Sequence, residues 1–260
     1  MPRTDRLAHK PKFNQKALRR RRLHFFTGLF VVFFLISSTF FIVQRNQQAQ
    51  QIQLEKYPIQ GVILNQADGF VDFQSLAQQN KLSFCYLNAT SGATYFDDNF
   101  NVNVNRIEAT DLKVGVIHYF SFDSSANAQF QYFKQKVKDN VGELPIAIYV
   151  QYYENDKRDV DWEKQGPKLA QLTVKLANYY NQPVIIKTTP KIYQILNQHY
   201  IKKSHFWLDK APKSHQKQNI DFVQYDDKHR FKNGRNYISL PVSYYAHSKK
   251  QYQTEINKNS

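Results

Sequence analysis

The chain has 260 residues, enough for one large domain or two small ones, and a formal net charge of +15. Nine of its 36 Lys and Arg residues lie before residue 23 and are opposed there only by Asp5, so a strongly basic tail precedes a moderately basic body. The single cysteine, Cys85, excludes an intrachain disulfide and a metal cluster built from cysteines.

The N-terminal segment has the pattern of a membrane anchor. Residues 1–22 are polar and basic without apolar periodicity, so we expect a disordered tail. Residues 25–43 carry no charge and are rich in Phe, Val, Leu and Ile, and as a helix rising about 1.5 Å per residue they just span a hydrocarbon core of about 30 Å. We therefore place a transmembrane segment at 23–43. Four arginines, Arg19 to Arg22, precede the apolar segment, and only Arg45 follows it closely. This difference in positive charge predicts a cytoplasmic N-terminus and an extracellular body.

A cleaved signal peptide is the competing interpretation of this segment, because such peptides also begin with a charged region. The apolar stretch is longer than a usual signal core. Large residues, Phe40 to Val43, stand where a small-residue cleavage site would fall. We therefore expect an uncleaved signal anchor. Residues 44–56 form a Gln-rich linker, either helical or flexible, before a globular body at 57–250 and a polar tail at 251–260.

Apolar runs alternate with segments of helical spacing through the body. Strands are predicted at 61–65, 82–89, 114–120, 145–151 and 183–187, and helices at 71–79, 100–109, 124–138 and from Pro167 and Pro190 onward. Ser124 is the expected cap of the third helix, and Pro167 is expected in the first turn of the fourth. Three β-like runs follow at 206–208, 220–225 and 237–242 without helix signals. This order predicts an irregular, TIM-like (β/α) barrel that loses its helices in the last three strands.

Five short motifs, in order, resemble glycoside hydrolase family 25, the cell-wall muramidases (lysozymes) of bacteria and phages. They are the opening GVILNQADGFVDF at 61–73, FCYLNATSG at 84–92, YFDDNF at 95–100, VGVIHYF at 114–120, and the late Trp207-Leu208 with FVQY at 222–225. The resemblance covers about residues 57–245. It implies a barrel whose site lies at the carboxyl ends of the strands, with no metal and no cofactor.

The acidic residues of the family are replaced in this chain. By the motif register, the family's first-strand Asp falls on Ile63, its D-x-E pair on Tyr149 and Gln151, and its late Asp on Ser239. Glycosidic bond cleavage requires a carboxylic acid that protonates the leaving oxygen and a second carboxylate. General acid catalysis alone contributes about 10²- to 10⁴-fold. The resemblance therefore predicts a pseudoenzyme.

Two other sources of chemistry are open. Asp68 and Asp72 follow the first strand, and Glu154 and Asp156 follow the strand at 145–151, so relocated carboxylates could act in their place, although solvated loop or capping roles also fit. Tyr149 could act as a nucleophile, as tyrosine does in sialidases, but it has no acid partner at the matching position.

Aromatic and amide side chains remain where the family has its cleft. The glycan-binding candidates near strand ends are Tyr119, Tyr149, Tyr152, Trp207, Gln224 and Tyr225, with core packing as the alternative role. His118 matches a family position that supports the strand, so we expect a structural imidazole.

These observations predict a membrane-anchored, extracellular muramidase-like domain of a Gram-positive-type cell surface, without catalysis, that binds peptidoglycan, another cell-wall glycan or an envelope partner. The alternative is an active lysozyme that hydrolyses peptidoglycan with relocated carboxylates. Nucleic-acid binding is disfavoured by the outward topology and by the lack of a clustered basic-aromatic stripe in the body. The sequence leaves the oligomeric state open.

Overall fold

A computed structural model describes residues 15–152, 160–210 and 219–259. The chain divides into two compact units, Met1–Glu55 and Lys56–Ser260. The described residues of the first unit form helix α1 (Gln15–Lys56), which ends one residue into the second. Its segment His24–Arg45 is long and apolar enough to cross a membrane by length and composition, and its side chains are exposed. The helix includes residues 15–22, which we had expected to be disordered, and continues through the Gln-rich linker.

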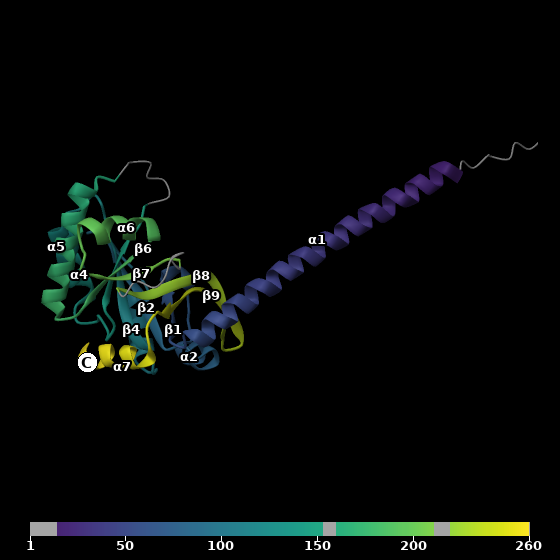
Figure 1. The fold of residues 1–260 in the computed structure, drawn as a ribbon. Helices are drawn as coiled ribbons and strands as arrows, with labels where there is room; N and C mark the ends of the chain where they lie inside the picture. The colour runs from purple at the N-terminus through teal and green to yellow at the C-terminus, as the bar shows by residue number, and fades with distance from the viewer. Residues whose placement is uncertain (1–14, 153–159, 211–218, 260) are drawn as a thin grey trace, which may run out of the picture. The chain divides into compact units, whose positions relative to one another are not determined.

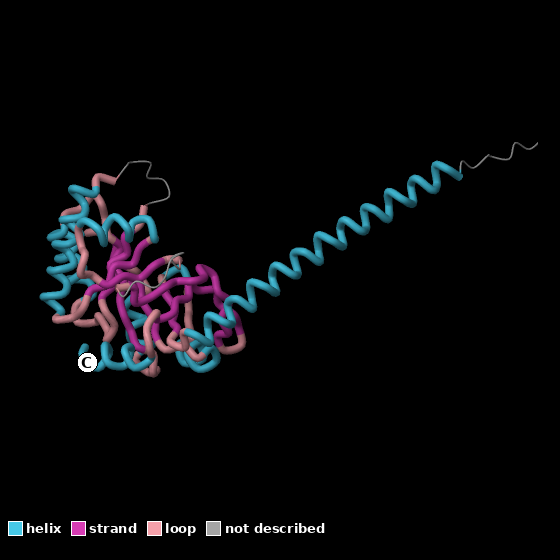
Figure 2. Tube along the Cα trace, viewed as in Figure 1, coloured by secondary structure: helices cyan, strands magenta, loops and turns pink. Residues whose placement is uncertain are grey.

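The second unit is built around a closed barrel of eight strands, drawn at its centre in Figures 1 and 2. The barrel strands are β1 (Gln60–Leu64), β2 (Phe84–Ser91), β4 (Lys113–Tyr119), β5 (Ile146–Val150), β6 (Val184–Thr188), β7 (His205–Leu208), β8 (Ile220–Asn233) and β9 (Asn236–Tyr245). All neighbours pair in parallel except β9, which is antiparallel to both β8 and β1. The short strand β3 (Tyr95–Phe96) adds to the outside of β2. The predicted irregular (β/α) barrel is confirmed.

Helices connect the parallel strands and cover the barrel. These are the 3₁₀ turn η1 (Gln66–Asp68), α2 (Phe73–Asn80), α3 (Phe100–Ile107), α4 (Ala126–Val137), α5 (Trp162–Tyr180) and α6 (Pro190–His199). Asp72, Asp161 and Thr189 accept backbone N–H groups at the starts of α2, α5 and α6, which fixes where each helix begins.

Two predicted helix starts were wrong. Ser125, rather than Ser124, caps α4 and accepts the N–H of Ala128 at 3.1 Å. Pro167 lies inside α5 rather than in its first turn, because the Asp161 carboxylate caps the helix further upstream. A proline at an interior position removes one backbone hydrogen bond. The cap and the buried Leu169, Leu172 and Leu176 hold the helix in spite of that loss.

The barrel interior is filled with aromatic side chains, and two glycines make room for them. A Cβ atom at Gly61 would lie 2.2 Å from the ring of Phe84, and one at Gly115 would lie 2.4 Å from the ring of Tyr86. Both rings are fully buried. Any larger residue at these two positions would displace a ring from the core.

A helix that the sequence did not predict closes one end of the barrel. Helix α7 (Lys249–Asn259) falls largely within the expected polar tail, yet Tyr252 and Ile256 are buried against Phe84 and other interior residues. In Figure 1 it crosses the end of the second unit where the strands begin. We predicted that no helices accompany the last three strands. This is correct between β8 and β9, which form a direct hairpin, but helix α7 follows β9.

Candidate active site

The carboxyl ends of the parallel strands meet at the end of the barrel opposite α7. Because side chains alternate along a strand, the residues two positions after the buried interior residues also point inward. We call this group the barrel mouth; its members are Ile63, Asn88, Tyr119, Tyr149, Lys187, Asp209 and Gln224. The strand register places Tyr119 beside Tyr149, and Tyr149 beside Lys187.

A buried ion pair lies in the middle of the barrel mouth. Lys187 Nζ contacts Asp209 Oδ1, and the Lys187 side chain is 2% exposed. Burial lowers the pKa of the Lys187 ammonium, while the charge of Asp209 opposes that shift. The backbone N–H of Asp209 donates to the carbonyl of Thr188 at 3.0 Å, which fixes the aspartate just beyond the end of β7.

The tyrosines of the barrel mouth continue this polar network. Tyr149 donates its hydroxyl to Asp209 Oδ2 at 3.0 Å, and Lys187 Nζ lies 3.9 Å from the centre of the Tyr149 ring. Tyr119 packs against Tyr149 with ring centres 5.0 Å apart and accepts a hydrogen bond from Asn88 at 3.2 Å. Burial, followed by the charge of Asp209, raises the pKa of Tyr149. Its phenol is therefore protonated at neutral pH and is a poor nucleophile.

Two amide oxygens of the barrel mouth have no hydrogen-bond partner in the described part of the chain. They are Asn88 Oδ1 and Gln224 Oε1, and both atoms are buried. The other end of the Gln224 amide is satisfied, because Nε2 donates to Asp227 Oδ1 at 2.6 Å. Buried acceptors of this kind are normally paired. These two oxygens have no access to solvent in this structure, so a ligand donor reaches them only when neighbouring side chains move.

The four substituted family positions do not all gather at the barrel mouth. Ile63 and Tyr149 are part of it, and Gln151 follows directly after β5. Ser239 is exposed and pairs with Arg230 in the outer part of the β8–β9 hairpin. That hairpin continues past the barrel, because β9 pairs with β1 only at residues 242–244. Ser239, to which the motif register assigned the family's late Asp, therefore does not lie with the other three positions.

The glycan-binding candidates also separate into groups. Tyr119, Tyr149 and Gln224 are in the barrel mouth, and Tyr152 lies beyond β5 with 36% of its surface exposed. Trp207 is fully buried and donates Nε1–H to Ser243 Oγ at 3.1 Å, so its ring presents no face to a ligand. Tyr225 packs with the outer core and donates to Gln60 Oε1 at 3.0 Å, near the start of β1. Neither of these two side chains is therefore part of the barrel mouth.

The carboxylates considered as relocated catalysts have other partners where they are described. Asp68 accepts the N–H of Asn65 at 2.8 Å, and Asp72 accepts that of Ser75 at 3.0 Å, so both cap helical turns. Glu154 and Asp156 lie outside the described residues. His118 is buried, contacts Thr90 Oγ1 and Gln129 Oε1, and has its pKa lowered to about 4 by burial, which fits the expected structural imidazole.

The sequence interpretation missed Lys187, Asp209 and Asp227. A signal was present, because Lys187 interrupts the apolar run at 184–188 and Asp209 directly follows a buried strand. A charge in such a run requires a buried partner. Within the described residues, no group of three or more His, Cys, Asp or Glu side chains is arranged to hold a metal ion.

The model of the family described as Glycosyl hydrolases family 25 matches residues 64–234. The chain belongs to glycosyl hydrolases family 25. The resemblance inferred from the short motifs is therefore confirmed at the level of the family.

Solved structures share the fold of this family 25 chain. A family 25 glycosyl hydrolase from Bacillus anthracis superposes with a TM-score of 0.68 at 24% identity, covering 76% of this chain and 94% of that one. A lysozyme from Streptomyces coelicolor gives a TM-score of 0.66 at 18% identity, covering 78% and 98%. The modular autolysin LytC from Streptococcus pneumoniae, solved with a synthetic peptidoglycan ligand, gives 0.60 at 15% identity, covering 72% and 46%.

A sequence relative covers a smaller part of the chain. YegX of Escherichia coli strain K12 is 29% identical over 99 residues, a match that spans 36% of this chain and 36% of YegX. This chain thus corresponds to about a third of the length of that relative.

Proposed function

We propose that this family 25 chain is a membrane-anchored, extracellular domain that binds peptidoglycan without cleaving it. The observation that carries the proposal is the state of Asp209. Asp209 is the carboxylate of the barrel mouth, and its two oxygens are taken by Lys187 and by the Tyr149 hydroxyl. An aspartate held by two donors has no proton to give to a leaving group.

The substituted family positions support the same conclusion. Ile63 and Gln151 have no ionisable group, and the Tyr149 phenol remains protonated because burial raises its pKa. A glycosidase uses two carboxyl groups about 5–9.5 Å apart, one as acid and the other as base or nucleophile. In the barrel mouth, a lysine and a tyrosine occupy the space beside the one carboxylate that both contact.

Binding is supported by what the barrel mouth still presents. The oxygens of Asn88 and Gln224 have no partner among the described residues, and sugar hydroxyl or amide donors would pair with them once ligand entry moves the side chains that cover them. The ring of Tyr119 in the barrel mouth and that of Tyr152, which lies beyond β5, supply apolar faces. Peptidoglycan is the proposed ligand because family 25 members are muramidases and lysozymes, and LytC is described with a peptidoglycan ligand.

Anchoring is supported by helix α1. Its segment His24–Arg45 exposes a continuous apolar surface that lipid would cover, with Arg19 to Arg22 on its N-terminal side. On intact cells, added protease should remove the body and leave the N-terminal tail protected. A mature protein that begins near residues 45–50 would instead indicate a cleaved signal peptide.

The functional test uses the full chain in detergent micelles with purified peptidoglycan. We expect the chain to co-sediment with peptidoglycan and to release no reducing ends. Gln224→Leu should weaken binding by about fivefold to tenfold, since it removes a buried acceptor. The matched control, Gln79→Leu on the exposed face of α2, should leave binding unchanged.

The alternative function is hydrolysis by Asp209 together with Asp227, which lies close enough for its charge to act on Tyr149 and Lys187. Robust release of reducing ends that is abolished by Asp209→Asn or Asp227→Asn would establish that alternative. Under our proposal, the triple change Ile63→Asp, Tyr149→Asp and Gln151→Glu recovers at most a trace of activity, and Gln151→Glu alone recovers none.

A further inference from the structure

The β8–β9 hairpin continues past the barrel as a two-stranded ribbon. Strand β8 pairs with β7 only at residues 220–223, and β9 pairs with β1 only at 242–244. Between residues 228 and 240 the two strands pair with each other, with Arg230 opposite Ser239 and Lys232 opposite Tyr237 (Figure 1). We call residues 228–240 the basic ribbon. No member of the barrel mouth belongs to it.

The basic ribbon has one covered face and one open face. Phe231 and Leu240 are buried on the side that packs towards α2. The backbone of Lys232 forms two hydrogen bonds with the side chain of Asn80 at the end of that helix, at 2.7 and 3.1 Å. Successive side chains of a strand face opposite sides. The residues that alternate with the buried ones therefore share the other face, and all of them are exposed: Lys228, Arg230, Lys232, Tyr237 and Ser239.

The basic ribbon carries cations without counter-charges. It contains no Asp or Glu and four basic residues, which are Lys228, Arg230, Lys232 and Arg235. Among the described residues, none of these four forms an ion pair. Residues two positions apart on a strand lie about 6.7 Å apart, which is less than the screening length of about 8 Å in physiological salt. The three charges on the open face of β8 therefore repel one another, and bound anions would relieve that repulsion.

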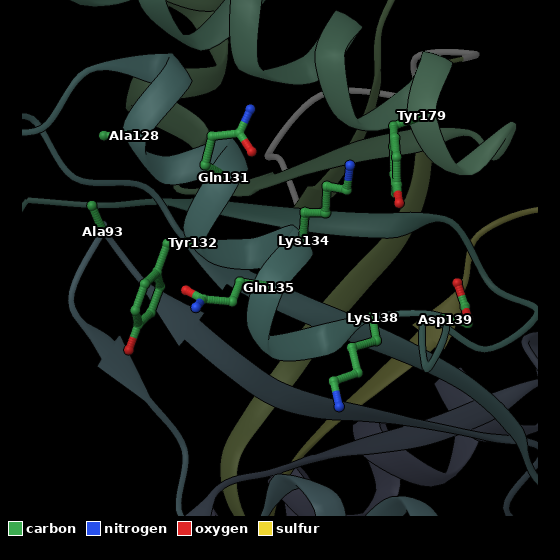
Figure 3. Close-up of a pocket in the computed structure, with 9 residues that line it drawn as sticks. All are labelled: Ala93, Ala128, Gln131, Tyr132, Lys134, Gln135, Lys138, Asp139 and Tyr179. Carbon is green, nitrogen blue, oxygen red and sulfur yellow. The ribbon is translucent and has the colours of Figure 1, made fainter.

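The cations of the open face point to one side of the ribbon, because they alternate along a single strand. The outer surface at the end of α4 is different. Figure 3 shows the side chains of Lys134 and Lys138 pointing away from each other, with the acidic Asp139 following directly in the chain. A single plane of anions can meet all the cations on the open face of the basic ribbon, but it cannot meet both of these lysines.

An exposed tyrosine lies among the cations of the open face. The Tyr237 side chain is 58% exposed, and the Arg230 guanidinium lies 4.1 Å from the centre of its ring. Tyrosine is enriched at membrane–water boundaries, where its ring meets acyl chains and its hydroxyl stays among the headgroups. A basic residue near an anionic lipid surface gains about 1 kcal/mol. The open face thus has the two residue types that suit the surface of an anionic membrane.

The chain itself keeps the basic ribbon close to a membrane. The apolar segment of α1 ends at Arg45 and the second unit begins at Lys56, so the residues between them reach at most about 36 Å when fully extended. Tyr57 then stacks on Tyr244 of β9, with ring centres 4.3 Å apart. The chain therefore enters the second unit beside the strand that continues into the ribbon. A short tether raises the effective concentration of the ribbon at the lipid surface, an advantage that a soluble polyanion lacks.

We propose that the basic ribbon docks on anionic phospholipid headgroups of the membrane in which the chain is anchored. This inference rests on the anchoring in the proposed function and is independent of glycan binding. Lys228, Arg230 and Lys232 contact headgroup phosphates, and the ring of Tyr237 lies at the boundary between headgroups and acyl chains. Docking holds the body in one orientation against the membrane surface.

The test is a lysine-acetylation footprint of the full chain in nanodiscs of phosphatidylcholine, with and without phosphatidylglycerol. Mass spectrometry reports each lysine separately, so the basic N-terminal tail does not obscure the ribbon. Acetylation of Lys228 and Lys232 should be about fivefold slower in the anionic discs. Acetylation of Lys202 and Lys203, an exposed pair after α6, should change less than about twofold, because charges beyond the screening length act weakly. Equal slowing of all four lysines, or of none, would overturn the proposal.

A pair of charge-matched variants sharpens the test. Arg230→Gln combined with Arg235→Gln removes two exposed charges that form no ion pair in the described chain, so the midpoint of thermal unfolding should stay the same. The protection of Lys228 and Lys232 in anionic discs should fall below about twofold. The control, Lys202→Gln with Lys203→Gln, removes the same charge and should leave that protection intact. Equal protection in the two variants would contradict the proposal.

Two further measurements separate the possible failures. Polyphosphate added to discs of phosphatidylcholine alone should protect the ribbon lysines less than phosphatidylglycerol does, and equal protection would assign the ribbon to a soluble polyanion instead. Size-exclusion chromatography shows whether the chain stays in the disc. A chain released from the disc would refute the anchoring itself, whereas a retained chain with unprotected ribbon lysines would refute only the docking.

Discussion

The two ends of the barrel differ in what fills them. At the end closed by α7, aromatic rings pack on one another, with ring centres of Phe84 and Phe222 5.1 Å apart and those of Tyr245 and Tyr252 5.2 Å apart. We call this end the barrel base. The barrel mouth instead holds the Lys187–Asp209 ion pair, tyrosine hydroxyls and unpaired amide oxygens. The interior of one closed sheet is thus filled by aromatic rings at the barrel base and by polar side chains at the barrel mouth.

The difference shows which end maintains the fold. Full burial of a large apolar side chain stabilises a protein by about 1.5–3 kcal/mol. A buried ion pair gains little overall, because desolvation offsets the attraction between the charges. In barrels of this type the end with the strand termini carries function and the other end carries stability. Substitutions at Ile63 and Gln151, the positions to which the motif register assigned the family's acids, are therefore expected to leave the barrel intact.

The largest expected effect is at Trp207, which lies between the two ends. Trp207→Ala should lower the free energy of unfolding by about 3–5 kcal/mol, because it empties a fully buried site in the interior. Chemical denaturation of the full chain in micelles measures this change. Trp207→Phe should cost less than half as much. A variant that keeps its stability but loses glycan binding would restore Trp207 as a ligand contact.

Asp209→Ala tests the barrel mouth itself. The change leaves the Lys187 ammonium buried without its partner, so we expect a loss of about 2–4 kcal/mol in the free energy of unfolding. Lys187→Met combined with Asp209→Ala should recover most of that loss, since both charges are then removed. A double-mutant cycle measures the coupling. A double variant as unstable as Asp209→Ala would show that the aspartate acts through Tyr149 rather than through Lys187.

His118 lies on the barrel strand β4, and its side chain packs against α4. We expect it to make the free energy of unfolding fall at acid pH. Burial lowers its pKa from 6.5 to about 4 in the folded chain, so the unfolded chain binds the proton first as the pH falls. The stability that depends on neutral His118 is complete above pH 6.5 and declines as the pH falls toward 4, by about 2 kcal/mol at pH 5. Comparison with His118→Gln from pH 7 to pH 5 isolates this effect. Parallel curves for the two proteins would contradict it.

The smallest expected effect is at the barrel base, where stability should fall as the pH rises instead of as it falls. Asp221 accepts hydrogen bonds from His205 at 2.9 Å and from His247 at 3.1 Å, which raises the pKa of both imidazoles. The contribution of the two protonated imidazoles to stability is therefore complete below pH 6.5. It is lost as the pH rises through their raised pKa values. His205 is 56% exposed, so solvent limits the effect to less than about 1 kcal/mol. Asp221→Asn should abolish this dependence between pH 6 and pH 8.

Local patterns in the sequence were sufficient for the architecture. Alternating strand and helix periodicities, together with five ordered motifs, predicted the barrel and its family, because each depends on residues close together in the chain. The assignment of the family's acidic positions to Ile63, Tyr149 and Gln151 rests on the motif register and stays a prediction. The helix α7 was not, since its composition is mostly polar and only Tyr252 and Ile256 reach the core.

Tertiary structure decided which of these side chains meet. The pairing of Lys187 with Asp209 depends on neighbouring strands whose residues lie 22 positions apart, so no local spacing predicts it. The closure of the barrel turned Trp207 inward and Tyr225 outward, because successive residues of a strand face opposite sides. The length of the β8–β9 hairpin carried Ser239 away from the barrel mouth. The sequence determined the barrel, whereas strand register and barrel closure determined the contents of the barrel mouth.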